Sequence, residues 1–426
     1  MAIDFSVEPE FQEQLDWVRQ FCEEEIAPFD LMFPAAIRLK HPAVMPHVKR
    51  MQDQIKERGL WALFLGKELG GPGFGQVKLA LLNEILGRYP AAPGFFGTAA
   101  PDTGNMELLA EFGTPEQKER WLYPLMRQEI FSAYSMTEPQ GGSDPNLFVT
   151  SAVKEGDEYV INGEKWFTSA GRYADILLVM TVNGMFVVPR NTPGVTIMPE
   201  PRNHNHIVYK DVRVPLDHLL GPEDGAKVLA QKRLAGGRIH HARRGLAQCH
   251  LAFDMMCERA LSRNSHGNVV AQHQMVQERI ADSYAKIQQL RLLILWSAWT
   301  IDNVGTQAAR TQIAATKYTV AKTLREVAYD AMHMFGALGT TDLTPLQAMW
   351  ANAPTMSVMD GVDEVHKVTV AKNVLKGYKA HEGLWPTHFT PFQREAAQKK
   401  FEPLLAEDPE LRQYSEGMQA YMAGRH

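Results

Sequence analysis

Residues 148–170 of this 426-residue chain read FVTSAVKEGDEYVINGEKWFTSA and decide how the rest is divided. Polar and apolar residues alternate through the stretch, which is the pattern of half-buried β-strands. Asn162 and Gly163 interrupt the alternation and predict a hairpin turn, because glycine accepts the left-handed backbone of such turns. A second Asn-Gly pair and further short strands follow, so the sequence predicts an antiparallel β domain over residues 130–227.

The sequence on both sides of this domain has the helical period of 3.6 residues. Residues 1–129 contain several amphipathic segments, beginning with PEFQEQLDWVRQF. Residues 228–385 contain three long amphipathic runs, which together with a helix that starts at Asp363 predict a four-helix bundle. Residues 386–426 predict a helical extension with no assigned role. The expected fold class is therefore α+β and mostly α, with an N-terminal helical domain, a middle β domain and a C-terminal bundle.

Composition excludes several classes of function. The net charge is −5 and no long basic run occurs, so we expect no nucleic acid partner. No run approaches the roughly 18 apolar residues of a membrane helix, and the N-terminus lacks a secretory signal pattern. The histidines of NHNH, residues 203–206, have no further ligand at metal spacing, so we expect no metal site. Unpaired cysteines are typical of reduced thiols and predict a cytoplasmic protein: Cys22, Cys249 and Cys257.

Two polar stretches suit a ligand. SAYSMTEPQGGSD, residues 132–144, crowds hydroxyl groups and glycine N–H groups into one loop, which favours a phosphate or a heteroaromatic ring. The alternative is a polar connection between two domains. EKWFTSAG, residues 164–171, places Trp166 beside Thr168, and an aromatic face next to a hydroxyl suits a planar cofactor. The alternative is a tryptophan of the core.

Two further stretches carry isolated charges. RIHH, residues 238–241, is predicted to open a long helix near its positive end, where Arg238 is placed to hold an anion. A solvated helix terminus is the equal alternative. Asp360 stands between Met359 and a glycine after a largely uncharged run, whereas Asp363 is explained by the dipole of the helix it begins. The alternative for Asp360 is a cap of that helix.

Five motifs together resemble signatures of the acyl-CoA dehydrogenase family, in the order of that family and over roughly residues 8–385: YSMTEPQGGSD, KWFTSAG, RNSHGNVVAQHQ, HMFGALGT and MDGVDEVHK. GRIHH and DGVDEVH are most similar to its subgroup of family members 10 and 11. The resemblance implies FAD in a cleft between the β domain and the bundle. It also implies α,β-desaturation of an acyl-CoA thioester.

The resemblance assigns roles by position. It implies that Asp360 is the base that removes the α-proton, while its backbone N–H and a ribityl hydroxyl polarise the thioester carbonyl. Substrate contacts fall on Ser143, Arg238 and Gly361. FAD contacts within one subunit fall on Tyr134, Met136, Thr137, Gly142, Ser143, Trp166, Phe167, Thr168, Val362 and Glu364. FAD contacts from a neighbouring subunit, and hence a homodimer or homotetramer, fall on Arg263, His273, Gln274, His333, Gly336 and Ala337.

The sequence departs from the family pattern at a few places. The base, usually glutamate, is Asp360, and the phenylalanine that follows the pyrophosphate-binding arginine is His266. Ala337 replaces the second glycine of the adenine turn. The expected electron acceptor is an electron-transferring flavoprotein. Two alternatives remain open: an acyl-CoA or nitroalkane oxidase on the same fold, and a non-catalytic CoA-binding scaffold.

Overall fold

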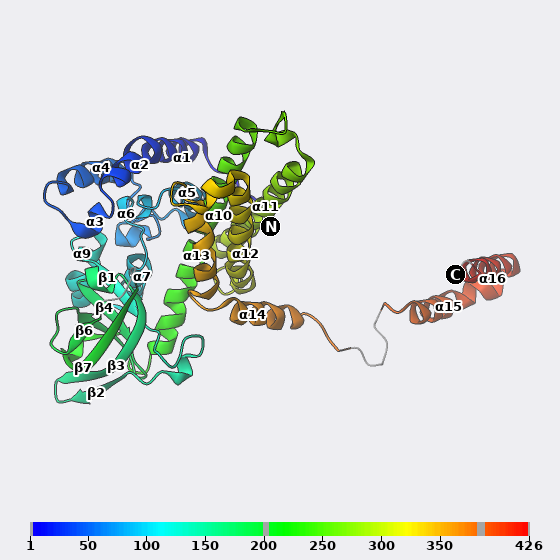
Figure 1. The fold of residues 1–426 in the computed structure, drawn as a ribbon. Helices are drawn as coiled ribbons and strands as arrows, with labels where there is room; N and C mark the ends of the chain where they lie inside the picture. Colours follow the sequence, from blue (N-terminus) through cyan, green and yellow to red (C-terminus); the bar gives the residue numbers. More distant parts are fainter. Residues whose placement is uncertain (1–2, 199–203, 381–387, 425–426) are drawn as a thin grey trace. The chain divides into compact units, whose positions relative to one another are not determined.

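The computed structural model describes residues 3–198, 204–380 and 388–424 (Figure 1). It forms two compact units, Met1–Ala371 and Lys372–His426, and each is described by itself. The expected fold class is confirmed: the first unit begins with short helices, continues with β-strands and ends with long helices.

The N-terminal part of the first unit is helical because its apolar residues recur at helical spacing. In α1 (Pro9–Phe21) the four buried residues lie three or four positions apart. They enter one apolar cluster with side chains of α4 (Met45–Glu57) and α5 (Gly75–Leu86). The remaining helices, some of a single turn, are α2 (Ala27–Met32), α3 (Ala36–Leu39), α6 (Ala92–Phe95), α7 (Asp102–Phe112), α8 (Pro115–Gln117) and α9 (Tyr123–Met126).

The middle part is a pair of four-stranded sheets. One has the order β1-β4-β5-β8 and the other β2-β3-β7-β6. Every pair in these sheets is antiparallel except β1 with β4, which run parallel because a whole strand pair separates them in the chain. Alternate residues of both sheets face a shared core. The strands are β1 (Ser132–Ser135), β2 (Ser151–Glu155), β3 (Glu158–Ser169), β4 (Ile176–Met180), β5 (Met185–Pro189), β6 (Val195–Ile197), β7 (His204–Pro215) and β8 (Leu219–Leu220).

The hairpin predicted at Asn162 and Gly163 is wrong. Both residues lie inside β3, at a shift in its register with β7. A Cβ on Gly163 would come within 2.6 Å of the Cβ of Thr150, so glycine is required here for close approach rather than for a turn. The other Asn-Gly pair does join two strands, and the backbone N–H of Thr181 bonds the carbonyl of Gly184 at 2.9 Å.

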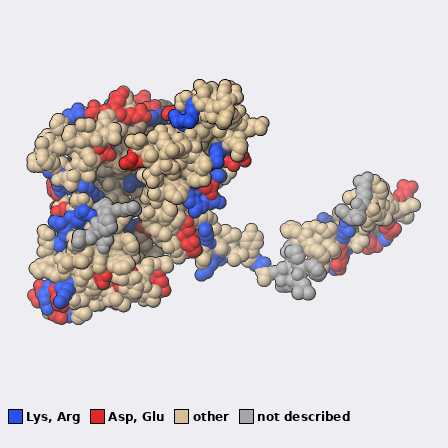
Figure 2. Space-filling model, in the orientation of Figure 1, with Lys and Arg blue, Asp and Glu red and all other residues tan. Residues whose placement is uncertain are grey.

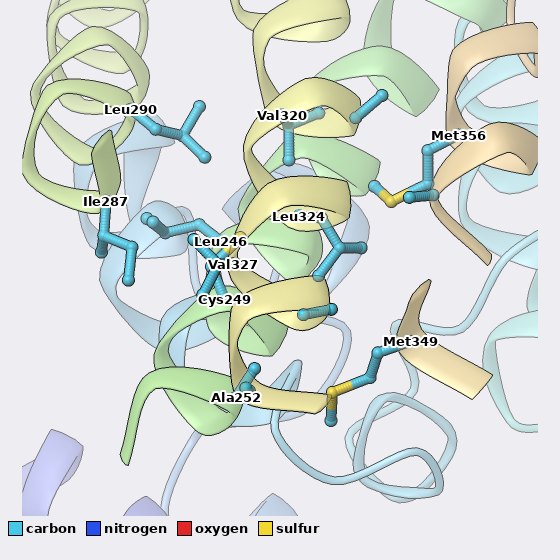
Figure 3. Close-up of a cluster of buried hydrophobic side chains, with 14 of the residues drawn as sticks. Leu246, Cys249, Ala252, Ile287, Leu290, Val320, Leu324, Val327, Met349 and Met356 are labelled. Atoms are coloured by element: carbon cyan, nitrogen blue, oxygen red, sulfur yellow. The ribbon is translucent and has the colours of Figure 1, made fainter. Parts of the chain in front are cut away.

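The last part of the first unit is a bundle of α10 (Ala226–Ser262), α11 (Gln274–Asn303), α12 (Arg310–Phe335) and α13 (Leu346–Val358). Leucine, isoleucine, valine and alanine side chains from these helices fill one core, with Met349 and Met356 of α13 at its edge (Figure 3). The predicted helix that starts at Asp363 exists as α14 (Asp363–Leu375), but it is not the fourth helix of the bundle. It buries only His366, whereas α13 buries four residues.

The second unit contains α15 (Thr390–Glu407) and α16 (Pro409–Ala423), which lie within the predicted extension. Asp408 separates the two helices, and its side chain accepts a hydrogen bond from the N–H of Leu411 at 3.0 Å.

Acidic and basic side chains are interspersed on the face of the chain in Figure 2. Among the described residues, no helix has the length and apolar character needed to cross a bilayer.

Candidate active site

A short loop between α13 and α14 presents Asp360. Both Asp360 and Gly361 have left-handed backbones, with φ of 53° and 98°. Aspartate tolerates this region better than most residues, and glycine adopts it freely. A Cβ on Gly361 would lie 3.0 Å from Nε2 of His366, so a larger residue is crowded as well as strained. The loop conformation therefore depends on both residue types of the Asp-Gly pair.

The Asp360 carboxylate is almost buried and poorly paired. Its side chain is 11% exposed. Nη1 of Arg233 lies 3.6 Å from Oδ1, and Nε2 of His241 lies 3.5 Å from Oδ2. Within the described residues Oδ2 is buried and has no hydrogen-bond partner. A buried carboxylate oxygen without a donor is costly, and such costs are retained mainly where the group has a chemical task.

The backbone of the same loop is held firmly. Nε of Arg238 donates to the carbonyl oxygen of Asp360 at 2.9 Å, and Nε2 of His366 lies 3.3 Å from that oxygen. Nζ of Lys317 donates to the carbonyl of Ser357 at 2.8 Å and to Asp363 at 3.2 Å. The loop is thus fixed from α10, α12 and α14, while the carboxylate that it carries keeps a free oxygen.

Burial controls the protonation of the groups around the carboxylate. It lowers the pKa of His241 to about 4, although the nearby Asp360 acts in the opposite direction. His241 is therefore a neutral imidazole at pH 7. Burial also lowers the pKa of the Arg238 guanidinium from its ordinary value.

Tyr134 of β1 joins the β domain to this site. The guanidinium carbon of Arg233 lies 4.5 Å from the centre of the Tyr134 ring, a cation–π arrangement. Burial raises the pKa of the tyrosine hydroxyl well above its ordinary value, and among the described residues that hydroxyl has no partner. The structure therefore brings Tyr134, Arg238, Asp360 and Gly361 of the predicted site residues to one place.

The prediction that RIHH opens a helix is wrong. Arg238 lies in the interior of α10, which already begins at Ala226. The residues before it, AKVLAQKRLAGG, contain no proline and no cap that would stop the helix there. Arg238 therefore holds a loop backbone from a helix side rather than an anion at a helix end. Its predicted contact with CoA stays a prediction.

Trp166 and Phe167 form an exposed aromatic pair. They lie at a bulge where the register of β3 and β7 shifts, and Phe167 has a φ of 55°. The bulge turns two successive side chains outward, so Trp166 is 39% and Phe167 66% exposed. The two rings are nearly perpendicular, with an interplanar angle of 86°, so each presents its own apolar surface to a ligand. This excludes the alternative of a core tryptophan.

The loop that precedes these rings is tied to them through the backbone. The N–H of Trp166 donates to the carbonyl of Thr137 at 2.8 Å. The hydroxyl of Thr168 is buried and lies 3.0 Å from that of Ser135, which in turn lies 2.9 Å from that of Tyr209. The Thr168 side chain is thus already paired inside the β domain, and its contact with the flavin edge stays a prediction.

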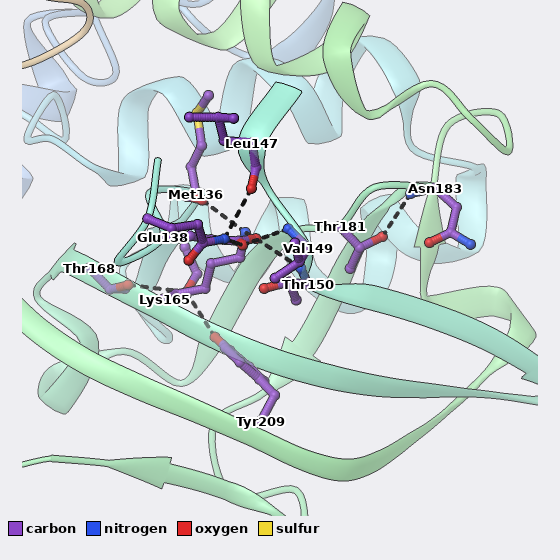
Figure 4. A network of polar contacts seen from close by, with 12 residues as sticks. Met136, Glu138, Leu147, Val149, Thr150, Lys165, Thr168, Thr181, Asn183 and Tyr209 are labelled. Carbon is purple, nitrogen blue, oxygen red and sulfur yellow. Dashed lines mark hydrogen bonds and ion pairs between the residues drawn. The ribbon is translucent and has the colours of Figure 1, made fainter. Parts of the chain in front are cut away.

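The sequence reasoning missed a buried ion pair inside two of the quoted motifs. Nζ of Lys165 lies 2.7 Å from Oε1 of Glu138 and donates to the carbonyl of Met136 at 2.8 Å (Figure 4). The two side chains are 0% and 1% exposed. Glu138 also accepts from the N–H groups of Val149 and Thr150. The signal was present, because a lysine in an alternating strand occupied an inward position.

The pair fixes the loop that carries the predicted flavin contacts. Burial on its own disfavours the charge of Glu138, but the hydrogen bonds from Lys165 and Val149 outweigh it and hold the pKa at about 2. Burial lowers the pKa of Lys165 to about 8 against the effect of Glu138. At pH 7 both groups are charged, so the loop is anchored by a complete pair.

The remaining predicted residues fall into two groups. Gly142, Ser143 and Glu364 are exposed, and Val362 is half-buried beside Asp360. The other group lies at the far end of the bundle, where the guanidinium of Arg259 contacts the Phe335 ring at 5.4 Å. A rise of about 1.5 Å per residue places Arg263 roughly 37 Å from Arg238 along α10. This distant group consists of Arg263, His273, Gln274, His333, Gly336 and Ala337.

Three family models match the chain in succession. They describe the N-terminal, middle and C-terminal domains of acyl-CoA dehydrogenases and match residues 8–129, 133–211 and 223–375. The chain belongs to the acyl-CoA dehydrogenase family. The resemblance drawn from the five sequence motifs is thereby confirmed.

Relatives of this acyl-CoA dehydrogenase family member are similar over most of the chain. The protein named acyl-CoA dehydrogenase FadE2 of Mycobacterium tuberculosis is 38% identical over 79% of this chain and 87% of its own length. Acyl-CoA dehydrogenase family member 11 of Gallus gallus is 34% identical over 85% of this chain, which spans 50% of that protein. A Mycobacterium abscessus structure assigned to the acyl-CoA dehydrogenases is 33% identical, with a TM-score of 0.81 over 88% of this chain and 100% of that one.

The residues of this family member fit a flavin. The exposed Trp166 ring is available for stacking, with the Phe167 ring set edge-on beside it, and the adjoining loop is anchored by Glu138 and Lys165. A Cβ on Gly142 would meet nothing within 4 Å, so the loop leaves open space beside its backbone. The Tyr134 hydroxyl, which has no partner in the part of the chain that the structure describes, adds a buried hydrogen-bonding group. Aromatic, hydroxyl and backbone groups are the set that a planar heteroaromatic cofactor requires.

Proposed function

We propose that the chain is an FAD-dependent acyl-CoA dehydrogenase that introduces an α,β double bond into an acyl-CoA thioester, with Asp360 as the base. The observation that carries this proposal is Oδ2 of Asp360, a buried carboxylate oxygen with no hydrogen-bond partner among the described residues, on a loop held from three helices. Family membership supports the reaction class, and the departure from glutamate to aspartate keeps the carboxylate.

FAD, when bound, supplies the acceptor for the hydride that leaves the β-carbon. Oδ2 of Asp360 takes the α-proton, so the α-C–H bond breaks and an O–H bond forms on the carboxyl group. Proton transfer of this kind requires contact of about 3 Å between heavy atoms. Asp360 and Gly361 both have left-handed backbones, and we assign the peptide N–H of Asp360 to the thioester carbonyl.

The residues that would hold FAD come from two subunits. Trp166, Phe167, Thr137, Gly142 and Ser143 would hold the flavin end. The distant group around Arg263 would hold the pyrophosphate and adenine of a neighbouring copy, because a guanidinium binds a pyrophosphate with two hydrogen bonds. Within one chain Arg263 lies roughly 37 Å along α10 from Arg238, which holds the Asp360 loop, so we assign the Arg263 group to the flavin site of a neighbouring copy. The proposal therefore requires a homodimer or homotetramer.

Reduction of the purified protein by acyl-CoAs tests the function. We expect a yellow protein with an oxidised flavin spectrum that bleaches under anaerobic conditions when members of an acyl-CoA panel are added. Slow reoxidation by oxygen and fast reoxidation by an electron-transferring flavoprotein support a dehydrogenase. Fast reoxidation by oxygen would make the chain an oxidase, and a colourless protein that still binds acyl-CoA would make it a scaffold. A tight FAD-loaded monomer in sedimentation would contradict the shared site.

A further inference from the structure

One face of α10 lies against the carboxyl group of Asp360. Arg233, Gly237 and His241 recur every four residues, so they form a single stripe along the helix. Nη1 of Arg233 lies 3.6 Å from Oδ1 of Asp360, and Nε2 of His241 lies 3.5 Å from Oδ2. We call these three residues the α10 cradle. The stripe spans two helical turns and faces a single acidic side chain.

Gly237 is the residue that lets the carboxylate approach. A Cβ at this position would lie 2.6 Å from Oδ2 of Asp360 and 3.3 Å from its Cγ. Glycine in the interior of a helix is unfavourable relative to alanine, so its presence in α10 calls for a reason. The contact supplies that reason, because the carboxylate occupies the space that any other side chain would fill.

Arg233 holds the opposite oxygen. Its side chain is 9% exposed and stacks against the Tyr134 ring, which restricts the guanidinium to one position beside Oδ1. His241 lies on the other side, beside Oδ2. Four other charged or titratable groups at the loop are occupied with its backbone or with each other: Arg238 and His366 contact the Asp360 carbonyl, and Lys317 pairs with Asp363.

We propose that the α10 cradle orients the Asp360 carboxylate, with Oδ1 held by Arg233 and Oδ2 kept in the gap above Gly237 as the proton acceptor. This inference rests on the proposed function and deepens it, because it names three positioning residues outside the loop that carries the base. Arg233 and Gly237 act through Asp360 and make no contact with the reacting carbon in this account.

Gly237→Ala is the first test. The new methyl group displaces the carboxylate, and a misplacement of about 1 Å can reduce a rate about 100-fold. We expect unchanged FAD content and acyl-CoA binding, with flavin reduction slower by about that factor. Gly417→Ala is the matched control, since a Cβ in α16 would meet nothing within 4 Å, and its rate should equal that of the wild type. A normal rate in Gly237→Ala would overturn the role of the gap.

Arg233→Met tests the charge. Removal of the cation disfavours the anionic carboxylate, so the acid limb of the pH profile of flavin reduction should move to higher pH. Arg233→Lys should restore most of this shift. Lys232→Met removes a charge from the adjacent residue, which pairs with Glu111 on the exposed side, and should leave the profile unmoved. A purely structural Arg233 would change stability without moving the limb.

A double-mutant cycle in urea separates this inference from the proposed function. Arg233→Met, Asp360→Asn and the double variant are compared by their unfolding midpoints, which need no substrate. A non-additive midpoint supports the contact even if no acyl-CoA reduces the wild type, an outcome that would contradict only the proposed function. Additive midpoints together with an unmoved pH limb would overturn the cradle.

Discussion

Two buried carboxylates in this molecule have opposite surroundings. Glu138 in the loop of the β domain accepts hydrogen bonds from Lys165, Gln140 and two backbone N–H groups, all between 2.6 and 3.1 Å. Asp360 has two cationic or imidazole neighbours at 3.5–3.6 Å and one oxygen with no donor among the described residues. The first arrangement is what a structural anchor requires, and the second is what a base requires.

The comparison shows that one buried carboxylate stabilises a loop, whereas the other is left able to accept a proton. A fully bonded buried ion is specific and rigid, so it suits the loop that presents a flavin face. An underbonded carboxylate is costly on its own, but an oxygen already engaged by strong donors is a weak proton acceptor. A substitution at one of these two carboxylates should therefore leave the surroundings of the other unchanged.

Glu138→Gln should give the largest loss of stability. It leaves Lys165 buried without its anion, and breaking a buried pair in this way costs about 3–5 kcal/mol. Urea unfolding at pH 7 measures the change. Glu155→Gln is the control, because its pair with Arg213 is about half exposed and its removal should have no measurable effect. Equal midpoints for both variants would show that the buried pair is no anchor.

The pH dependence of unfolding should show the same anchor. The pKa of Glu138 is lowered from 4.5 to about 2, because its hydrogen bonds outweigh the effect of burial. Its contribution, roughly 3 kcal/mol, is therefore complete above pH 4.5 and is lost as the pH falls through about 2. The difference in stability between the wild type and Glu138→Gln should shrink between pH 5 and pH 3, measured by urea midpoints. A constant difference would contradict the ionised state.

Gly163→Ala should give a smaller effect on the same network. A new Cβ would lie 2.7 Å from Cα of Thr150, whose N–H donates to Glu138, so the strand must shift. Crowding of this kind typically costs about 1–3 kcal/mol. Gly156→Ala is the control: its φ of 64° is also positive, against 153° at Gly163, but nothing lies within 4 Å of the new methyl. A larger loss in the control than in Gly163→Ala would exclude crowding at Thr150.

Local pattern predicted the order of helical, β and helical segments and singled out Asp360. Periodicity finds elements because burial of one face is a local property of the sequence. Periodicity failed at Asn162-Gly163, because this glycine is required by its close contact with Thr150 of a neighbouring segment. It also failed at α14, which has amphipathic spacing but is not a helix of the bundle. A local sequence pattern does not show which residues far apart in the chain will be in contact.

The site shows the same limit. Asp360 was found as an isolated carboxylate, and Trp166 by its motif. The Glu138–Lys165 pair and the approach of Gly237 to Asp360 join residues 27 and 123 positions apart in the chain. The inward position of Lys165 in its strand indicated a buried partner. Gly237 indicated nothing of the kind, because glycine occurs within helices for several different reasons. Only the packing of α10 against the loop shows that Gly237 leaves space for the Asp360 carboxylate.

Anaerobic stopped-flow reduction of Asp360→Asn by an acyl-CoA that reduces the wild type tests the central claim most directly. Asparagine tolerates the left-handed backbone, so the loop and the FAD content should be retained. The account predicts a reduction rate lower by about 10²–10⁴-fold, the usual contribution of a positioned base. Asp363→Asn, which changes the neighbouring carboxylate bound to Lys317, should keep most of the rate. Near-normal reduction by Asp360→Asn, with a large loss in Asp363→Asn, would contradict the account.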